Sequence, residues 1–400
     1  MLENIKSVHK NYQRRYGTVA IKTYGYEQAK DVCNFHSSFP EYSVTPLVNL
    51  HSLAKELGVK DIYVKDESKR FGLNAFKVLG GSYAIAKEIA ERLQLEGEKM
   101  TYKELTSTAV KEKLGELTFV TATDGNHGRG VAWTANRLGQ KAVVFMPKGS
   151  SLERLHNIQA LGAEASITDL NYDDAVRLAN KTAQDCGGVV IQDTSWEGYE
   201  KVPQHIMQGY TTFAYEMVNQ LGDVRPTHIF LQAGVGAMAG AVTAFLADYY
   251  KENIPIITVV EPENANCLYR TALADDGKLH NVSGDLQSIM AGLCCGEPCS
   301  LGWEILNTYV DNFISMPDEV AAVGMRVLGN PLAGDVPIIS GESGAAGVGL
   351  LASVLRYQEL ASLKEKLQLD SNSIVLCIST EGDTDKENYR RIVWDGKYGV

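Results

Sequence analysis

A lysine stands at the start of an apolar helical stretch, where its side chain could form a covalent bond with an aldehyde. Lys77 lies in the segment NAFKVLGG, residues 74–81. Position alone would suggest an ordinary solvated lysine. Burial would lower the pKa of the ammonium group, however, and imine formation with an aldehyde cofactor needs such a lysine. The local sequence leaves both interpretations open.

A second candidate segment is TDGNHG, residues 123–128, which lies between a predicted strand and a predicted helix. Its glycines allow the backbone to approach a ligand closely, and Asn126 can hydrogen-bond a ring oxygen or a carboxylate. The alternative is a well-formed strand-to-helix turn in which Asp124 and Asn126 act as caps. We expect His127 to be structural and assign it no catalytic role.

The segment GVGAMAG, residues 234–240, follows another predicted strand and consists of small residues. Its backbone N–H groups could point at an anion, and the next helix would add its positive N-terminal end. The residues expected to hold a phosphate are Gly234, Val235, Gly236, Ala237, Met238 and Gly240. A dinucleotide site is the alternative, but the spacing G-x-G-x-x-x-G differs from G-x-G-x-x-G. A phosphate site without a nicotinamide is the favoured interpretation.

The last candidate segment is STEGDTD, residues 379–385, after the C-terminal predicted strand. The hydroxyl of Ser379 at a strand end could be a neutral hydrogen-bond partner for a ligand. A polar loop without a function is the alternative on local evidence.

These segments follow short β-branched runs that alternate with helical stretches. We expect strands at residues 61–65, 117–122, 142–146, 164–168, 189–192, 227–232, 255–260 and 373–378. We expect helices at residues 76–93, 128–138, 152–161, 173–184, 238–250, 317–328 and 345–355. The alternation predicts an α/β protein with mostly parallel sheets covered by helices. Ligands bind at the carboxyl ends of such strands, which is where the candidate segments lie.

Length and charge further limit the kind of protein that this chain can be. The 400 residues exceed the size of a single core, which predicts two lobes. A net charge of −11 argues against a nucleic-acid partner, because phosphate neutralisation needs clustered Lys and Arg. Residues 1–16 contain no apolar signal region, and no apolar run is long enough to span a bilayer. We therefore expect a cytoplasmic protein without a membrane partner.

The seven cysteines are scattered, which predicts free thiols rather than a disulfide framework. Cys294, Cys295 and Cys299 lie close together in the sequence. They lack paired C-x-x-C spacing, and His280 is the one histidine near them. We therefore expect no metal site there.

Together and in this order, these segments resemble those of the fold-type II pyridoxal-phosphate (PLP) enzymes. The resemblance implies two lobes of twisted, mostly parallel sheet covered by helices, with PLP in the cleft between them. It also implies that Lys77 carries the cofactor, that Asn126 contacts its 3-hydroxyl and that the backbone of residues 234–240 holds its phosphate. Ser379 would face the pyridine nitrogen. A hydroxyl there makes a weaker electron sink, which favours loss of a β-substituent over transamination.

Two acidic residues refine this resemblance. Asp124 stands where dehydratases typically have a hydroxyl residue, and Asp193 follows another predicted strand. Carboxylates would attract an ammonium group or act as bases, so a substrate with two amino groups is favoured. The segments at residues 65–77, 123–133, 231–240, 289–293 and 379–385 resemble those of the diaminopropionate ammonia-lyase family.

This second resemblance implies a PLP-dependent α,β-elimination of 2,3-diaminopropionate, in both D and L forms, to pyruvate and ammonia. Lys77 and Asp124 would be bases on opposite faces of the cofactor, and Asp193 would orient the β-ammonium group. We further expect a larger PLP-binding domain of residues 1–115 and 195–400, a smaller domain of residues 116–194, and a homodimer. A serine or threonine dehydratase and a catalytically silent PLP-binding protein are the alternatives.

Overall fold

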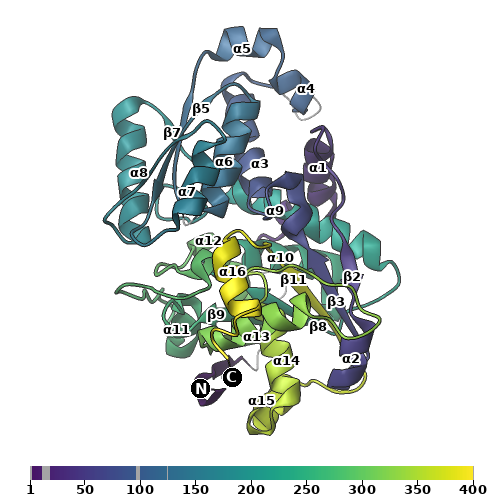
Figure 1. Ribbon diagram of the computed structural model, residues 1–400. Helices are drawn as coiled ribbons and strands as arrows, with labels where there is room; N and C mark the ends of the chain where they lie inside the picture. The colour runs from purple at the N-terminus through teal and green to yellow at the C-terminus, as the bar shows by residue number, and fades with distance from the viewer. Residues whose placement is uncertain (1, 11–18, 96–99, 124, 400) are drawn as a thin grey trace.

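Two β-sheets, each flanked by helices, form the protein. The computed structural model describes residues 2–10, 19–95, 100–123 and 125–399. Figure 1 shows the smaller sheet with its helices in the upper lobe and the larger sheet in the lower lobe. The predicted α/β class with mostly parallel sheets is confirmed.

Within the described residues, the larger sheet has seven strands in the order β1-β10-β9-β8-β11-β3-β2. They are β1 (Lys6–His9), β2 (Leu47–Asn49), β3 (Asp61–Asp66), β8 (His228–Gln232), β9 (Ile256–Pro262), β10 (Asn312–Met316) and β11 (Ile374–Ser379). The inner strands are mutually parallel, whereas β1 and β2 pair antiparallel at the two edges. Every residue of β8 and β10 is buried, because helices cover both faces of the sheet.

The smaller sheet has four parallel strands in the described residues, in the order β6-β5-β4-β7. They are β4 (Thr118–Ala122), β5 (Lys141–Met146), β6 (Glu164–Ile167) and β7 (Val189–Val190). The crossovers between them contain α6 (Asn126–Arg137), α7 (Leu152–Gln159) and α8 (Tyr172–Cys186). The short β7 ends two residues before the predicted limit, and the chain then leaves the sheet toward Asp193.

The remaining α-helices are α1 (Tyr26–Ser37), α2 (His51–Leu57), α3 (Val78–Arg92), α4 (Tyr102–Leu105), α5 (Thr108–Leu114), α9 (Lys201–Leu221), α10 (Ala237–Tyr250), α11 (Cys267–Ala274), α12 (Ser300–Tyr309), α13 (Asp318–Gly329), α14 (Ala346–Arg356), α15 (Ala361–Lys366) and α16 (Lys386–Val393). Figure 1 shows α13, α14 and α16 in front of the larger sheet. Across the described ranges, no helix combines the length and the apolar character that a membrane span requires.

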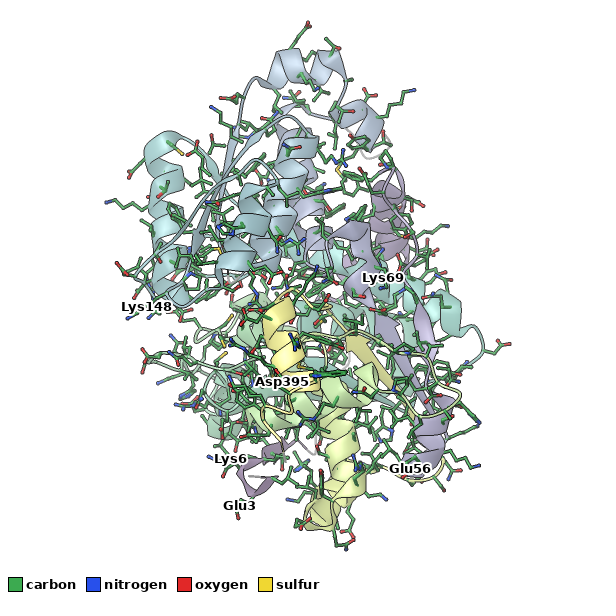
Figure 2. The ribbon with its side chains drawn as sticks, viewed as in Figure 1. Glu3, Lys6, Glu56, Lys69, Lys148 and Asp395 are labelled. Atoms are coloured by element: carbon green, nitrogen blue, oxygen red, sulfur yellow. The ribbon has the colours of Figure 1, made fainter. Side chains whose placement is uncertain are left out.

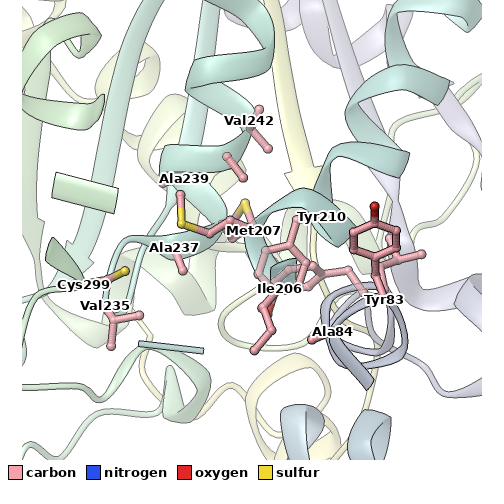
Figure 3. Packing of buried hydrophobic residues seen from close by; sticks show 14 of the residues in the cluster. Tyr83, Ala84, Ile206, Met207, Tyr210, Val235, Ala237, Ala239, Val242 and Cys299 are labelled. Atoms are coloured by element: carbon pink, nitrogen blue, oxygen red, sulfur yellow. The ribbon is translucent and has the colours of Figure 1, made fainter. Parts of the chain in front are cut away.

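The helix that follows Lys77 packs tightly against the long helix α9. A Cβ atom on Gly209 of α9 would lie 2.3 Å from the carbonyl oxygen of Leu79 in α3, so only glycine permits this approach. Figure 3 shows Ile206 and Tyr210 of α9 packed among buried side chains of this core. The contact fixes the start of α3, and with it Lys77, relative to α9.

A buried cluster of four charged side chains anchors the segment between β3 and α3. Lys65 Nζ lies 2.7 Å from Glu216 Oε2, and Arg70 Nη2 lies 2.8 Å from both Glu67 Oε1 and Glu216 Oε2. Each of these side chains is at most 2% exposed. The neighbouring Lys69, labelled in Figure 2, is exposed. The two positive and two negative charges cancel, and the ion pairs with Glu216 connect the segment to α9.

Candidate active site

A cavity lies between the two sheets, at the carboxyl ends of several parallel strands. The larger lobe contributes the glycine-rich loop after β8 and the segment after β11, and the smaller lobe contributes residues that follow β4 and β7. Among the predicted site residues, those that line the cavity are Lys77, Asn126, Asp193, Gly234, Val235, Gly236, Ala237 and Met238. The topology therefore brings most of the sequence-predicted residues together, as expected for sheets of this kind.

Lys77 and Asp193 form an ion pair inside this cavity. Lys77 immediately precedes α3, and its side chain is 20% exposed. Its ammonium group contacts Oδ2 of Asp193, whose side chain is 4% exposed. A lysine amine and a carboxylate held this close can exchange a proton and can act together on one bound group.

The surroundings of Asp193 keep its carboxylate ionised. Tyr172 donates a 3.3 Å hydrogen bond to Oδ1. Burial by itself raises the pKa of Asp193, but the positive charge of Lys77 and the neighbouring His127 bring that pKa well below its usual range. His127 is buried, and its Nε2 lies 2.7 Å from the carbonyl oxygen of Ile191. Asp193 is therefore a fixed negative charge in the site.

Asn126 begins α6, and its side chain reaches across the cavity to the larger lobe. Its Nδ2 donates a hydrogen bond to Oε2 of Glu381, a side chain that is 2% exposed and also lines the cavity. Sequence reasoning did not single out Glu381, although it lies within the segment 379–385. The available signal was an acidic residue directly after the two hydroxyl residues Ser379 and Thr380 at the strand end.

The glycine-rich loop, residues 234–240, presents backbone atoms to the cavity at Gly234 and Gly236, which have no side chains. Gly236 precedes α10 with a φ of 95°, a left-handed conformation that favours glycine. A Cβ atom on Gly234 would lie 3.1 Å from Cys295 Sγ. The N–H groups in the first turn of α10 have no intrahelical acceptors, so they can bind an anion.

Gly240 lies one turn into α10 and is not among the cavity-lining residues. Its N–H donates to the carbonyl oxygen of Gly236 at 2.8 Å, so this amide belongs to the helix. A Cβ atom on Gly240 would lie 2.9 Å from Cα of Gly302. The residue allows α10 and α12 to pack closely.

The hydroxyl at the end of β11 that lines the cavity belongs to Thr380. Ser379 is fully buried, and its Oγ donates to Ser340 Oγ at 2.7 Å. Thr380 Oγ1 accepts a 3.0 Å hydrogen bond from Gln232 Nε2, while Gln232 Oε1 is buried without a hydrogen-bond partner in the described part of the chain. Side chains alternate along a strand, so adjacent residues face opposite sides. The predicted role of Ser379 stays a prediction.

Asp124 lies outside the residues that the structure describes.

Tyr172 is a further side chain of the cavity that sequence reasoning missed, because a single tyrosine at the start of a helix carries no distinctive signal. Among the described residues, no group of three or more His, Cys, Asp or Glu side chains is placed to hold a metal ion.

The residues present fit a phosphorylated aldehyde cofactor. Gly234 and Gly236 stand before a helix N-terminus that suits a phosphate, and a Cβ atom at either position would lie 3.1 Å from a neighbouring side-chain atom, so the loop packs closely there. Lys77 supplies a partly exposed primary amine in the same cavity. Oε1 of Gln232 is buried and has no hydrogen-bond partner among the described residues, so it offers one polar position for a ligand group.

Comparisons with known proteins agree with this geometry. The family model of the pyridoxal-phosphate dependent enzymes matches residues 39–380. The diaminopropionate ammonia-lyase of Salmonella typhimurium is 52% identical over 402 residues, covering 99% of this chain and 100% of that protein. The solved holo structure of the Escherichia coli diaminopropionate ammonia lyase has a TM-score of 0.92 and 51% identity, covering 98% of this chain and 97% of that one.

A second solved structure holds the Escherichia coli enzyme in complex with an aminoacrylate-PLP azomethine reaction intermediate. It has a TM-score of 0.90 and 50% identity to this chain, and it covers 100% of this chain and 98% of its own. Identity at this level over the full length extends the match from the general fold to the particular enzyme family. The chain therefore belongs to the pyridoxal-phosphate dependent enzymes and, within them, to the diaminopropionate ammonia-lyase family.

Proposed function

We propose that this protein is a PLP-dependent carbon–nitrogen lyase that converts 2,3-diaminopropionate to pyruvate and two molecules of ammonia. The observation that carries the proposal is the Lys77–Asp193 ion pair in a cavity beside the glycine-rich loop. The membership of the diaminopropionate ammonia-lyase family agrees with it. When bound, PLP supplies an electron sink for negative charge at the substrate α-carbon.

We assign Lys77 two roles. In the resting enzyme, Nζ of Lys77 holds the cofactor. Once the amine is released from the cofactor, it takes the proton from the substrate α-carbon. The ammonium form stays in contact with Asp193, which stabilises the acquired charge. The electron pair left at the α-carbon forms a double bond to the β-carbon, the bond between the β-carbon and nitrogen breaks, and the β-ammonium group leaves as ammonia. The enamine product takes up water and loses the second ammonia to give pyruvate.

Asp193 recognises the second amino group of the substrate. A buried carboxylate attracts the β-ammonium group more strongly than it attracts the neutral β-hydroxyl of serine. Asp124 is proposed from the sequence as the base on the opposite face, which lets both enantiomers react. Two acids of this kind favour a diamino acid over the substrate of a serine or threonine dehydratase.

The cofactor contacts that we propose follow the cavity lining. Asn126 contacts the 3-hydroxyl, and the backbone from Gly234 through Met238 binds the phosphate with the positive end of α10. Gly240 contributes by close packing of the helix that presents these amides. Ser379 remains the proposed partner of the pyridine nitrogen, with the adjacent Thr380 as the second hydroxyl to test.

A stoichiometric assay tests the proposed function. Purified holoenzyme is supplied with 2,3-diaminopropionate or L-serine, and pyruvate and ammonia are measured in the same reaction. Elimination from the diamino acid gives two ammonia per pyruvate, and serine gives one. Faster turnover of serine would establish a dehydratase, and absence of both products would establish a silent PLP-binding protein.

We also propose a cytoplasmic homodimer, with a larger PLP-binding domain of residues 1–115 and 195–400 and a smaller domain of residues 116–194. The absence of disulfides among the described residues supports a reducing compartment, and the family resemblance supports the dimer. Light scattering coupled to size-exclusion chromatography should give the mass of two chains. A monomer mass would contradict the dimer.

A further inference from the structure

The geometry points to Glu381 as a positioning residue that fixes the side-chain amide of Asn126 in the cofactor site. The inference rests on the proposed PLP site and adds to it a residue that the expected cofactor contacts leave out. Glu381 joins three segments of the active site through separate contacts: the segment before Lys77, the start of α6 and the turn at Ser343.

The backbone of Glu381 is held opposite the segment that carries Lys77. Residues Ala75 and Glu381 form an antiparallel bridge. On either side of it, the N–H of Phe76 donates to the carbonyl oxygen of Thr380 at 3.1 Å, and the N–H of Gly382 donates to that of Asn74 at 3.0 Å. The position of the Glu381 backbone is therefore set by the same segment that places Lys77.

The carboxylate of Glu381 has a partner on each oxygen. Oε1 accepts from the N–H of Ser343 at 3.1 Å, and Oε2 accepts from Asn126 Nδ2 and from Thr384 Oγ1, the latter at 3.5 Å. The side chain is 2% exposed. Burial therefore limits access of water, and the three hydrogen bonds hold the carboxylate in one orientation.

An ionised carboxylate can only accept hydrogen bonds, and this decides how the Asn126 amide lies. The amide must present Nδ2 to Glu381 and keep Oδ1 on its other side, because the reverse arrangement would oppose two acceptors. A glutamine at position 381 would remove this constraint, since its own amide can either donate or accept. Asn126 could then adopt either amide orientation in the cavity.

Cofactor affinity tests this role without relying on turnover. Apoprotein is titrated with PLP while the cofactor absorbance band is recorded, in the wild type, Glu381→Gln, Asn126→Ala and the double variant. We expect Glu381→Gln to weaken PLP binding about tenfold, the effect of losing one hydrogen bond to a charged group. In the Asn126→Ala background the same change should have no further effect, because Glu381 acts through Asn126.

Glu387→Gln provides a matched control, because it makes the same chemical change on an exposed side chain of α16. It should leave PLP affinity unchanged. Circular dichroism verifies that each variant is folded. Unchanged affinity in Glu381→Gln, or losses that add fully in the double variant, would overturn the inference.

A measurement on the unaltered protein covers the case in which Glu381→Gln does not fold. With asparagine labelled by nitrogen-15, the Asn126 side-chain signal is identified by its absence in Asn126→Ala. We expect its amide protons to exchange slowly with water, and exchange as fast as that of the exposed Asn372 would overturn the inference. If the proposed function is wrong, pyruvate formation is absent while the PLP titrations give the same results. That failure can therefore be distinguished from failure of the role of Glu381.

Discussion

The ammonium group of Lys77 contacts the carboxylate of Asp193 between the two sheets, although the two residues lie 116 positions apart in the sequence. Lys77 precedes a helix that packs against α9, and Asp193 follows the last strand of the smaller sheet. Neither segment alone distinguishes a catalytic residue from a structural one. The contact places the fixed negative charge of Asp193 beside the candidate nucleophile Lys77. Removal of that charge is therefore a test of both residues.

Asp193→Asn should lower kcat for 2,3-diaminopropionate by about a hundredfold, within the usual contribution of a positioned acid or base. The asparagine keeps the size of the side chain but removes the charge that stabilises the Lys77 ammonium and attracts the β-ammonium group. Turnover of serine should fall less, because serine has no β-ammonium group. Steady-state pyruvate formation measures both. Equal losses on the two substrates would contradict the proposed recognition role.

Asp124→Asn should impair one enantiomer of 2,3-diaminopropionate far more than the other. If Lys77 takes the α-proton from one face and Asp124 from the other, removing one base leaves the second enantiomer with its own base intact. The measurement is kcat/KM for the D and L substrates in wild type and variant. Losses of the same size on both enantiomers would refute the assignment of two bases.

Much of the site could be predicted because each segment follows a strand with a strong β-branched pattern, and parallel strands place their carboxyl ends together. The helix α9 was not predicted. Most of its residues are buried, so it lacks the polar face that reveals a surface helix. The strand β10 was also missed, because it buries the polar Asn312 and Ser315.

Contacts between segments could not be predicted from the sequence. The pairing of Asn126 with Glu381 joins residues 255 positions apart, and nothing in either segment indicates the other. Adjacent residues of similar chemistry also cannot be separated by pattern alone. Ser379 and Thr380 both carry hydroxyl groups at the same strand end, yet Thr380 is the one that lines the cavity.

Glu342→Gln should change how stability depends on pH. Burial, followed by the negative charge of Glu381, raises the pKa of Glu342 from 4.5 to about 7. Between these pH values the unfolded chain releases a proton that the folded chain keeps, so this residue makes the wild type lose stability as pH rises. The loss amounts to at most about 3.5 kcal/mol, at roughly 1.4 kcal/mol for each pH unit.

The variant has no such proton to release at this position, so its stability relative to the wild type should rise between pH 5 and pH 7 and then level off. Urea unfolding followed by fluorescence at several pH values gives the comparison. Glu387→Gln on the exposed face of α16 should show no such trend. A constant difference between Glu342→Gln and wild type across this range would contradict the raised pKa.

Glu216→Gln should destabilise the fold by about 3 to 5 kcal/mol, the usual consequence of breaking a buried ion pair from one side. Burial alone raises the pKa of Glu216, but Arg70 and Lys65 bring it below its ordinary value. Removing the carboxylate leaves two buried cations to share Glu67. Glu91→Gln, which breaks an exposed pair with Lys201, should cost less than about 1 kcal/mol. Similar costs for both variants would show that the buried cluster is not a stabilising unit.

Two glycine-to-alanine changes near Lys77 should differ in their effect on stability. A Cβ atom on Gly209 would lie 2.3 Å from the Leu79 carbonyl oxygen and 2.8 Å from Cα of Gly80, and backbone atoms cannot move aside as a flexible side chain can. Gly209→Ala should therefore destabilise the protein by more than about 3 kcal/mol, the upper end of ordinary overpacking. It should also reduce PLP affinity, because α3 must shift and Lys77 stands at its start.

Gly81→Ala in α3 serves as the control. Its Cβ atom would meet Val131 Cγ2 at 3.5 Å, an ordinary van der Waals contact. Alanine also has the higher helix propensity, by about 1 kcal/mol, so this variant should be as stable as the wild type or more stable. Urea unfolding and PLP titration measure both variants. If Gly209→Ala keeps wild-type PLP affinity despite its lower stability, the packing of α3 on α9 does not position Lys77.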